Sequence, residues 1–437
     1  MSKENKIYKP KSISGFPEWL PEERLVEQKW FDHIRKTFES YGFCSIETPS
    51  VEEIDVLLAK GEVDKEIYVL ERIHKEENDK DARIALHFDQ TVPFARYTAQ
   101  HFNELVFPFK RYQIQRVWRG ERPQMGRMRE FYQCDIDVIN VDNLPLSFDA
   151  EIPAMAYEAL EGLNIGRVQM RISNRKILLG LLEYLGIEDS VSVTRIIDKI
   201  EKLSREEIEK LLADDGLNKD QINPILYLAE TKGTSDHVRS IKAQNDTMKE
   251  GIEELCFVMD ALAHLPEHAV VADLSIVRGL DYYTGTVYET QLLDVPEFIG
   301  SVCSGGRYDD LAGSFINKHL PGVGISIGFS RLFDVIRQSR PDLLNVGAKS
   351  PADVLVIFPN EDQRAIVGET ARALRSRGFK VEQYHAPQKL KKQLSYAEKK
   401  GIPFIWFPPF EDGQDHEVKD MNTGKQVKAD PQSWDKT

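Results

Sequence analysis

The sequence predicts a mixed α and β protein with more than one domain. The chain has 437 residues, and at about 150 residues per domain this length allows roughly three domains. Hydrophobic residues make up 41% of the chain, which is enough for sizeable cores. After residue 350, segments typical of strands alternate with segments typical of helices. That alternation predicts a small α/β domain with a largely parallel sheet.

The elements before this domain follow from local patterns. Residues 21–41 carry apolar side chains near helical spacing and should form an amphipathic helix that ends near Gly42. A strand is expected over 44–48, ending at Pro49, and a helix over 150–162. Residues 176–265 are highly charged and poor in Gly and Pro, with Leu and Ile at three- and four-residue intervals, and are expected to be an inserted helical module.

The last third of the chain should contain two more strands, a linker and the α/β domain. Strands are expected at 285–292 and 323–329, and 338–350 has the Pro, Gly, Ser and Asn content of a linker. Within 351–437 the expected strands are 354–358, 380–383 and 403–407, and the expected helices are 361–377 and 389–400.

Charge is distributed unevenly along the chain. The net charge is −14, which argues mildly against a protein that coats nucleic acid through its overall charge. Residues 110–129 nevertheless hold one acid, Glu121, and seven bases: Lys110, Arg111, Arg116, Arg119, Arg122, Arg127 and Arg129. Interleaved aromatic and β-prone residues predict two strands joined by a loop over 122–128, and so a hairpin that presents fixed arginines to an anion. A solvated charged face is the alternative.

The sequence positions of three arginines are consistent with a bound anion. Arg119 and Arg127 lie at opposite ends of the hairpin loop, and guanidinium groups suit phosphates because they donate in pairs and stay charged. Ion pairs with surface acids are the alternative. Arg331 falls in the first turn of a helix expected near Ser330, where a cation opposes the helix dipole unless an anion is bound nearby. Neither phosphate-loop nor dinucleotide-fold spacing occurs in the chain.

Other segments carry polar residues that could receive a small molecule. Arg278, Tyr282 and Tyr283 in RGLDYYTG could bind a carboxylate and a ring, although a Tyr-rich turn in the core is an alternative. The glycine-spaced strand over 322–328 suggests a flat surface close to a planar group, or else a structural bend. Gln133, Asp135 and Asp137 share one face of a strand, where buried carboxylates require a partner and an exposed face does not. Asp89 or Thr91 could simply cap a helix.

Taken together and in this order, these segments resemble the class II aminoacyl-tRNA synthetases, and within them the histidyl-tRNA synthetase family. Arg119–Asp137 is similar to motif 2 of the class, and Gly322–Phe333 to motif 3. The first helix and the strand ending at Pro49 are similar to motif 1, the class's dimer interface. RGLDYYTG and SGGRYD resemble two segments peculiar to the histidine enzymes. This chain departs from the family at three positions: Gln90 for the usual Leu, Ser304 for Ala, and Asp137 where Glu is frequent.

The resemblance implies a fold and a function. It implies an α+β catalytic domain built on an antiparallel sheet over 1–175 and 266–337, a helical insertion over 176–265, a linker over 338–350 and an α/β anticodon-binding domain over 351–437. It implies that ATP activates L-histidine to histidyl-adenylate with release of pyrophosphate, and that histidine then passes to the 3′ end of tRNA(His). A homodimer would form through motif 1. Basic residues of the last domain are candidates for anticodon contacts: Lys389, Lys391, Lys392, Lys399 and Lys400.

For ATP, the resemblance implies a set of phosphate and base contacts. Arg119 would hold the α-phosphate, Arg127 and Arg331 the distal phosphates, and Glu121 the adenine side, with Tyr132 or Phe131 stacked on the ring. Arg278 would bridge the amino acid carboxylate and the α-phosphate, which makes Arg278 and Arg119 the catalytic candidates. Mg²⁺ would accompany ATP, without a metal site on the protein.

For histidine, the resemblance implies two groups of contacts. Asp89, Thr91 and Gln133 would receive the α-amino group. Asp137 and Tyr283 would bracket the imidazole nitrogens, with Tyr282 and Tyr308 also in the pocket. A carboxylate and a phenol match the donor and acceptor of a neutral imidazole.

Two other functions remain open at this stage. One is a regulatory paralogue that binds histidine without aminoacylation, and the other is a class II synthetase for threonine, proline or glycine. Neither a membrane nor secretion is expected, because no apolar run approaches 18 residues and the first residues lack a signal-peptide core. Four widely separated cysteines fit a reducing cytoplasm.

Overall fold

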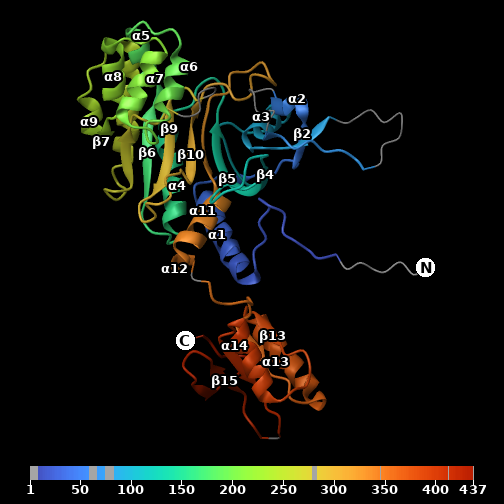
Figure 1. Cartoon of the computed structure of the whole chain (residues 1–437). Helices are drawn as coiled ribbons and strands as arrows, with labels where there is room; N and C mark the ends of the chain where they lie inside the picture. Colours follow the sequence, from blue (N-terminus) through green and yellow to red (C-terminus); the bar gives the residue numbers. More distant parts are fainter. Residues whose placement is uncertain are drawn as a thin grey trace. The chain divides into compact units, whose positions relative to one another are not determined.

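The computed structural model describes residues 8–58, 66–73, 83–277, 283–344, 346–411 and 413–436. The chain divides into two compact units (Figure 1). The first unit consists of Met1–Glu18 and Trp30–Leu344, and the second of Trp19–Lys29 and Asn345–Thr437. No helix within the described ranges is both long enough and apolar enough to cross a membrane.

The first unit is built on a large sheet. Its strand order over the described residues is β1-β4-β5-β11-β10-β9-β6-β8-β7. The strands are Cys44–Ser45 (β1), Phe109–Trp118 (β4), Glu130–Ile139 (β5), Gly322–Ile327 (β11), Cys303–Tyr308 (β10), Thr286–Leu292 (β9), Val168–Asn174 (β6), Val270–Asp273 (β8) and Lys232–Gly233 (β7). Neighbours from β4 to β6 pair antiparallel, whereas β1 pairs parallel with β4 and β8 parallel with β6. The expected antiparallel catalytic sheet is therefore confirmed, with parallel pairs toward its edges.

Helices cover one face of this sheet. They are α1 (Pro21–Ser40), α4 (Phe148–Glu161) and α11 (Phe329–Ser339), and α12 (Pro341–Leu344) follows α11. The Phe31 ring of α1 lies 3.9 Å from that of Phe329 in α11 and 4.9 Å from that of Tyr132 in β5. Because side chains alternate along a strand, the odd-numbered residues of β5 point to the opposite face.

The end of α1 shows why the predicted helix stops where it does. Gly42 has a φ of +80°, a conformation that glycine adopts without a steric penalty. Its N–H donates to the carbonyl of Glu39, and the N–H of Phe43 donates to the carbonyl of Phe38. These two bonds form a Schellman motif, whose accompanying apolar pair is Phe43 and Phe38, both buried.

The smaller elements of the first unit position the edge of the site. They are β2 (Val51–Glu53), α2 (Ile54–Leu57), β3 (Ile84–Leu86) and α3 (Thr91–Gln100). The expected strand over 44–48 is shorter than predicted, since β1 ends at Ser45. The N–H of Ile46 still donates to the Tyr112 carbonyl, and farther along, at Thr48, side chains make the contacts: the amide of Gln113 donates to the Thr48 hydroxyl, and the amide of Gln115 donates to the Thr48 carbonyl.

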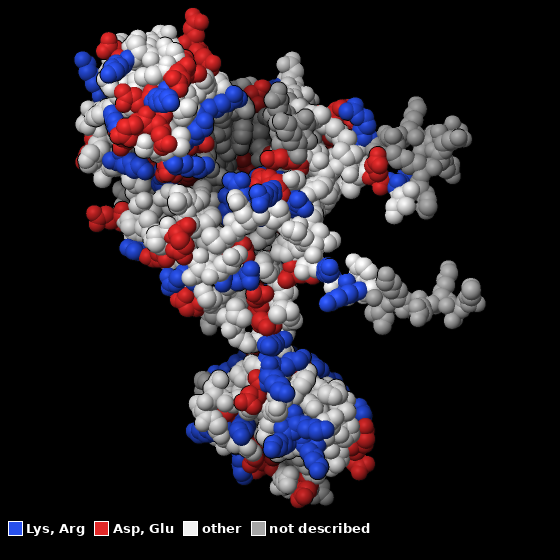
Figure 2. Space-filling model, in the orientation of Figure 1, with Lys and Arg blue, Asp and Glu red and all other residues white. Residues whose placement is uncertain are grey.

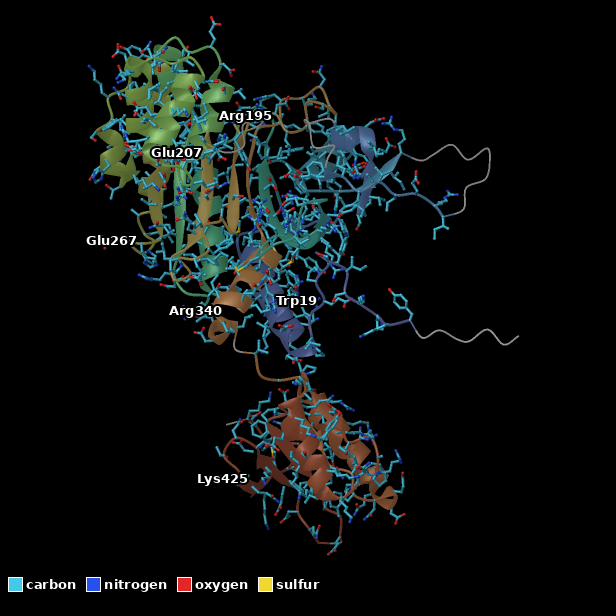
Figure 3. The ribbon with its side chains drawn as sticks, in the orientation of Figure 1. Trp19, Arg195, Glu207, Glu267, Arg340 and Lys425 are labelled. Carbon is cyan, nitrogen blue, oxygen red and sulfur yellow. The ribbon has the colours of Figure 1, made fainter. Side chains whose placement is uncertain are left out.

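The segment 176–265 is mainly helical, as expected, and it also contains the short strand β7. Its helices are α5 (Arg175–Tyr184), α6 (Ser190–Ile197), α7 (Arg205–Asp214), α8 (Lys219–Ala229), α9 (Ser235–Arg239) and α10 (Asp246–Ala261), and α5 to α9 gather beside β6 and β7 (Figure 1). Ser204 and Glu207 form a capping box at the start of α7. Exposed charged side chains such as Arg195 and Glu207 account for the polar composition of the module (Figure 3).

The second unit has its own sheet, in the order β13-β12-β14-β15-β16. Its elements are β12 (Val354–Val356), a short 3₁₀ helix (Glu361–Gln363), α13 (Arg364–Ser376), β13 (Val381–Gln383), α14 (Leu390–Lys400), β14 (Phe404–Phe407), β15 (Glu417–Asp420) and β16 (Gln426–Lys428). The three expected strands are parallel, as predicted. The antiparallel strands β15 and β16 were not predicted. Helix also occupies the first half of the segment expected as a linker, because α12 ends on the buried Leu344.

Candidate active site

The site-facing side of the sheet carries two rows of paired residues. Directly paired residues on neighbouring strands point to the same face. In the first row Asp137 pairs with Arg111 on one side and with Gly324 on the other. In the second row Asp135 pairs with Gln113 and with Ser326, which pairs in turn with Ser304. Four strands thus place polar side chains on the same face of the sheet, and glycine at position 324 leaves room beside them.

Two adjoining hollows lie on this surface. The arginine pocket has about 640 Å³ of open space and is lined by Arg119, Glu121, Gly126, Arg127, Met128, Phe131, Gln133, Ser301, Val302, Ser304, Ser326, Gly328 and Arg331. The acidic pocket has about 590 Å³ and is lined by Asp89, Thr91, Arg119, Gln133, Asp135, Asp137, Tyr283, Ser304, Tyr308, Gly324, Ile325 and Ser326. Both volumes suit small molecules. Four residues line both pockets, so their contents would meet there: Arg119, Gln133, Ser304 and Ser326.

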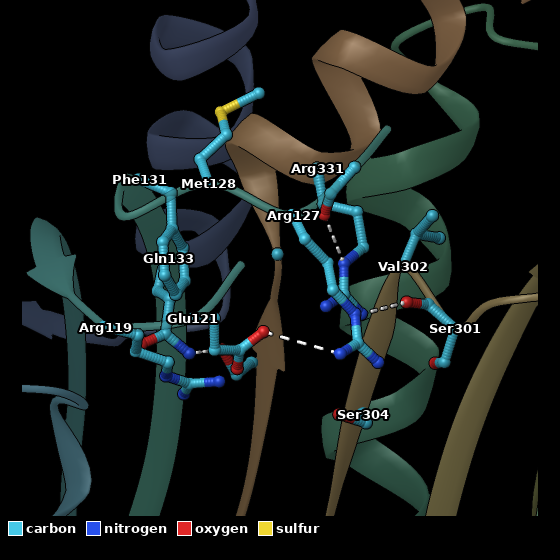
Figure 4. Close-up of a pocket in the computed structure, with 13 residues that line it drawn as sticks. Arg119, Glu121, Arg127, Met128, Phe131, Gln133, Ser301, Val302, Ser304 and Arg331 are labelled. Atoms are coloured by element: carbon cyan, nitrogen blue, oxygen red, sulfur yellow. Dashed lines mark hydrogen bonds and ion pairs between the residues drawn. The ribbon is translucent and has the colours of Figure 1, made fainter. Parts of the chain in front are cut away.

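The hairpin loop forms one wall of the arginine pocket (Figure 4). A tight turn brings Gln124 and Arg127 into a bridge, with Gly126 at a φ of +68°. The loop is tied to α11 at two points: the N–H of Gly126 donates to Asp334 Oδ2 (3.1 Å), and Arg331 Nε donates to the Gly126 carbonyl (2.9 Å). The predicted turn residue Gly126 therefore fixes the loop against the helix.

The charges of the arginine pocket favour an anion. Its lining contains three guanidinium groups and one carboxylate, that of Glu121. Arg127 is half exposed, and its Nη1 lies 3.4 Å from Glu121 Oε2. An exposed pair of this kind contributes little to stability. Arg119 is held more firmly, because its Nε donates to the Phe88 carbonyl (3.0 Å) and its guanidinium lies 5.2 Å from the centre of the Phe131 ring.

In the acidic pocket, Asp137 is held between two partners. Its Oδ2 lies 2.5 Å from Nη2 of the fully buried Arg111, and its Oδ1 accepts a hydrogen bond from the Tyr308 hydroxyl (3.0 Å). Burial raises the pKa of Asp137 to about 6, although Arg111 and Tyr308 favour the charged form. Arg111 also lies over the Phe94 ring, 4.1 Å from its centre. The expected partner for a buried carboxylate on this strand is therefore present.

Glycines on β11 make room for these polar groups. A Cβ atom at Gly324 would lie 2.0 Å from Asp137 Oδ1, and one at Gly322 would lie 2.3 Å from the Tyr308 ring. The glycine spacing of this strand predicts either a flat surface close to a planar group or a structural bend. In the structure the space at these two positions is taken by the protein's own Asp137 and Tyr308 side chains.

The start of α3 brings Asp89 and Thr91 to the acidic pocket. Asp89 Oδ1 accepts a hydrogen bond from the N–H of Val92 (3.2 Å), so the capping interpretation and the pocket interpretation both hold for it. Burial raises the pKa of Asp89, against the opposing effects of this hydrogen bond and of Arg119. The intervening Gln90 points into the sheet, where its amide donates to the carbonyls of Gln115 (3.0 Å) and Gln133 (3.1 Å). Gln90 thus anchors the helix start to β4 and β5.

Asp135 and Gln133 complete the pocket floor. Gln133 Nε2 donates to the Ser326 hydroxyl (2.8 Å). Within the described ranges, Gln133 Oε1 and Asp135 Oδ1 are buried oxygens without a hydrogen-bond partner. Burial raises the pKa of Asp135 to about 7, with Asp137 and Asp89 adding to the rise and Arg111 and Ser326 opposing it. Buried acceptors left open in this way are suited to a ligand that donates.

The structure brings together most of the expected site residues. Arg119, Glu121, Arg127 and Arg331 line the arginine pocket, and Asp89, Thr91, Gln133, Asp137, Tyr283 and Tyr308 line the acidic pocket. Arg278 and Tyr282 lie outside the described residues. The expectation for Tyr132 is corrected, because this ring points to α1 and packs on Phe31. Of the two aromatic candidates for stacking, Phe131 is the one that lines the pocket.

The interpretation of 110–129 as one anion site is also partly wrong. Lys110 pairs with Glu151 at 2.5 Å, and Arg116 lies over the Tyr132 ring on the face toward α1. Arg111 is a buried partner of Asp137. Alternation along β4 separates these cations, and a count of charges along the sequence does not reveal it. The role of Arg111 was therefore missed, and the signal for it was the predicted antiparallel pairing of β4 with β5.

The basic residues of α14, together with Lys389 at its N-cap, were expected as candidates for nucleic-acid contacts. Lys389, Lys391, Lys392 and Lys399 are exposed. Lys400 instead lies 3.6 Å from Glu382 and over the Tyr396 ring. Lys and Arg side chains gather on the face of this unit that Figure 2 shows. The patch is compatible with a polyanion.

Comparison with known proteins gives two family matches. A family model described as histidyl-tRNA synthetase matches residues 15–332. A second model, described as an anticodon binding domain, matches residues 353–434. The first match covers most of the first unit together with residues 19–29 of the second unit, and the second match lies within the second unit.

Similar proteins cover nearly the whole chain. A histidine–tRNA ligase of Thermobifida fusca is 55% identical over 438 residues, which is 99% of this chain and 99% of the relative. The crystal structure of histidyl-tRNA synthetase from a Nostoc species has a TM-score of 0.88 at 37% identity, with 97% of each chain covered. A Bacillus halodurans structure described as an ATP phosphoribosyltransferase regulatory subunit/histidyl-tRNA synthetase has a TM-score of 0.73 at 21% identity, covering 90% of this chain and 97% of that one. At that identity, the last match shows a shared fold alone.

Proposed function

The chain belongs to the histidyl-tRNA synthetase family, and from this premise we propose that it joins histidine to tRNA(His) in two steps. In the first, the carboxylate of histidine attacks the α-phosphorus of ATP, forming histidyl-adenylate and releasing pyrophosphate. In the second, the histidyl group passes to the 3′ end of the tRNA. Phosphoryl chemistry of the first kind depends on positioning and on charge neutralisation.

The observation that carries this proposal is the junction between the two pockets. Arg119 lines both, with the acids on one side and the other guanidinium groups on the other side. The carboxylate of an amino acid bound in the acidic pocket and the α-phosphate of ATP bound in the arginine pocket would therefore meet beside Arg119. Its side chain is fixed by the Phe88 carbonyl, so little reorganisation is needed when charge develops.

The arginine pocket would bind ATP. Arg127 and Arg331 would hold the distal phosphates, Glu121 would contact the adenine side, and Phe131 would stack on the ring. Mg²⁺ would enter with ATP as part of the substrate, since it is usually held by phosphates together with one or two carboxylates. Glu121 is the carboxylate among the described residues that line this pocket. Arg278 would bridge the amino acid carboxylate and the α-phosphate, a role proposed from the sequence resemblance.

The acidic pocket would bind histidine. Asp89, Thr91 and Gln133 would receive the α-ammonium group. Asp137 would accept from one imidazole nitrogen, with Tyr283 and Tyr308 beside the ring. Asp137 is supported in this role because Arg111 and Tyr308 fix both of its oxygens, which orients the carboxylate before substrate arrives. A pocket of oriented polar groups rejects side chains that leave those groups unpaired.

The remaining parts of the proposal concern partners and location. The second unit would read the anticodon, and its exposed lysines on α14 would contact the tRNA backbone. A homodimer would form through α1 and the segment ending at Pro49, and the enzyme would work in the cytoplasm. The proposed domains are a catalytic domain over 1–175 and 266–337, a helical insertion over 176–265, a linker over 338–350 and an anticodon-binding domain over 351–437.

Exchange of labelled pyrophosphate into ATP, with each amino acid in turn, tests the function directly. The purified chain should exchange with histidine alone. Exchange with threonine, proline or glycine would indicate another class II specificity, and binding of histidine without exchange would indicate a regulatory protein. Arg119→Ala should abolish exchange. Arg116→Ala is its matched control, because Arg116 lies on the same hairpin but faces α1, and it should leave exchange within twofold of the unmodified protein.

A further inference from the structure

Asp135 is a pocket residue without a role in the function proposed above. It is 4% exposed and lines the acidic pocket. Its Oδ1 has no hydrogen-bond partner among the described residues. A buried acceptor without a partner is costly in a folded protein, which points to a donor that arrives with the ligand.

The charges around Asp135 indicate what that donor carries. Three carboxyl groups line the acidic pocket: Asp89, Asp135 and Asp137. Two guanidinium groups face them, Arg119 in the lining and Arg111 behind Asp137. Ionisation of all five groups leaves one negative charge in excess. A ligand with one cationic donor would balance it.

The position of Asp135 on β5 selects among the parts of an amino acid. It lies on the same face of the strand as Gln133 and Asp137, with each step along that face spanning roughly 7 Å. Gln133 also lines the arginine pocket, where the substrate carboxylate would meet ATP. Asp137 stands at the end that would hold the ring. Asp135 is therefore placed beneath the middle of the substrate, where its α-carbon and ammonium group would be.

We propose that Asp135 is a further substrate-binding residue of the amino acid pocket, whose Oδ1 accepts a hydrogen bond from the α-ammonium group of the substrate beside Gln133 Oε1. This inference rests on the proposed function and adds one residue to its substrate contacts. It makes the ammonium group a requirement for binding in addition to the ring.

Protonation supports this role. The pKa of Asp135 is raised to about 7 by burial, with Asp137 on its own strand and Asp89 before α3 adding to the rise. Arg111 on β4 and the hydroxyl of Ser326 on β11 act in the opposite direction, and Cys303 on β10 is also within electrostatic reach. An ammonium group favours the charged carboxylate. Binding near pH 7 should therefore release a fraction of a proton from Asp135.

The test compares histidine with 3-(imidazol-4-yl)propionate, which differs from it only in lacking the ammonium group. Affinities are measured by calorimetry at pH 7.5 without ATP, on the full chain and on Asp135→Asn. The variant should lose at least tenfold in affinity for histidine and less than twofold for the propionate. Glu130→Gln is the matched control, a carboxylate-to-amide change on the same strand outside both pockets, and it should change neither affinity.

Two results would overturn the inference. An equal loss for both ligands would place Asp135 at the ring or in the framework of the pocket, and no loss would remove it from recognition. If the unmodified chain itself binds no histidine, the proposed function fails rather than this residue's role.

A second measurement needs no variant and covers the case in which Asp135→Asn does not fold. Proton release is obtained at pH 7 from binding enthalpies in two buffers of different ionisation enthalpy. After subtraction of the protons that each ligand's own imidazole loses on binding, taken from the titration curve of the free ligand, histidine should release more protons than the propionate does. Equal release by the two ligands would contradict an ammonium contact at Asp135.

Discussion

The guanidinium group of Arg111 lies buried behind the carboxylate of Asp137, with Nη2 2.5 Å from Oδ2. The two residues are directly paired across β4 and β5. This pair leaves Asp137 Oδ1 to the Tyr308 hydroxyl, so that the carboxylate reaches the pocket in one fixed orientation. A buried ion pair is weak evidence for stability, and its better-supported use is to specify one arrangement.

Arg111→Met should therefore damage both stability and histidine binding. Removing one partner leaves an uncompensated buried carboxylate, which destabilises by about 3–5 kcal/mol. Urea denaturation measures this loss, and pyrophosphate exchange should show a raised KM for histidine. Asp137→Asn added to Arg111→Met should recover part of the stability without recovering the KM. A double variant as unstable as the single one would contradict the pairing.

The stability of the ligand-free protein should depend on pH through Asp135. Its pKa is about 7 in the fold, against 3.8 for an ordinary Asp, so the folded state binds the proton more tightly. The folded state then loses stability as pH rises from about 4 to 7. Asp135→Asn removes this dependence. The difference in the free energy of unfolding, variant minus unmodified protein, should therefore increase by a few kcal/mol, in order of magnitude, as pH rises across that range. A flat difference between pH 4 and pH 8 would show that burial does not raise this pKa.

Gly324→Ala, a change in β11 of the first unit, should impair histidine binding and leave the fold of the second unit intact. A Cβ at this position would lie 2.0 Å from Asp137 Oδ1 and 2.8 Å from the Ile136 carbonyl oxygen, so the carboxylate must move. We expect KM for histidine to rise at least tenfold in pyrophosphate exchange. Gly368→Ala in α13 is the control, because its Cβ would meet only the flexible end of Arg372 at 3.3 Å. That change should leave KM unaltered and gain about 0.5–1 kcal/mol from helix propensity.

Asp334→Ala should weaken ATP binding selectively. Asp334 Oδ2 accepts from the N–H of Gly126, which fixes the turn that carries Arg127. Loss of a hydrogen bond to a charged acceptor is worth about 1.5–3 kcal/mol, so KM for ATP should rise roughly tenfold or more. KM for histidine should change less than twofold. Asp342→Ala removes an exposed partner of Arg340 and should leave both KM values unchanged. Equal effects of Asp334→Ala on the two substrates would indicate a general loosening instead.

Much of the fold could be predicted because its signals are local. Gly42 ends α1, Gly126 turns the β4–β5 hairpin, and the apolar spacing of 176–265 gives helices. The failures are of a different kind. β1 is shorter than predicted, and beyond Ile46 the segment is held at Thr48 by the side chains of Gln113 and Gln115, which are distant in sequence. Such tertiary contacts leave no local pattern.

The site shows the same division. The odd-numbered face of β5 was predictable from strand periodicity, and it carries Gln133, Asp135 and Asp137. Tyr132 was assigned against that periodicity and lies on the other face. Arg111 required knowledge of which residue stands opposite Asp137, because its position within a basic run predicted a different environment. The register of strand pairing, more than composition, distinguishes an arginine that is the buried partner of a carboxylate from an arginine that binds phosphate.

The second polar row of the sheet continues past the pockets into a buried cluster. Ser304 pairs with Glu289, and Glu289 pairs with Arg171 on β6. The Arg171 side chain is 3% exposed, lies 2.6 Å from Asp273 on β8, and also contacts Glu201 of the helical module. Lys232 on β7 lies 2.8 Å from the same Asp273. One arginine thus joins three strands of the sheet to the module.

Arg171→Met should consequently be among the more destabilising changes in the first unit. It keeps the apolar volume but leaves the carboxylates of Glu289 and Asp273 with less compensation, and we expect a loss of about 3–5 kcal/mol in the free energy of unfolding. Arg167→Met is the matched control, since Arg167 lies just before the same strand and pairs with Asp294 at 2.6 Å with 61% of its side chain exposed. An exposed pair contributes about 0–1 kcal/mol. Urea denaturation of both variants gives the comparison, and losses of equal size would show that burial of the Arg171 cluster does not determine its contribution.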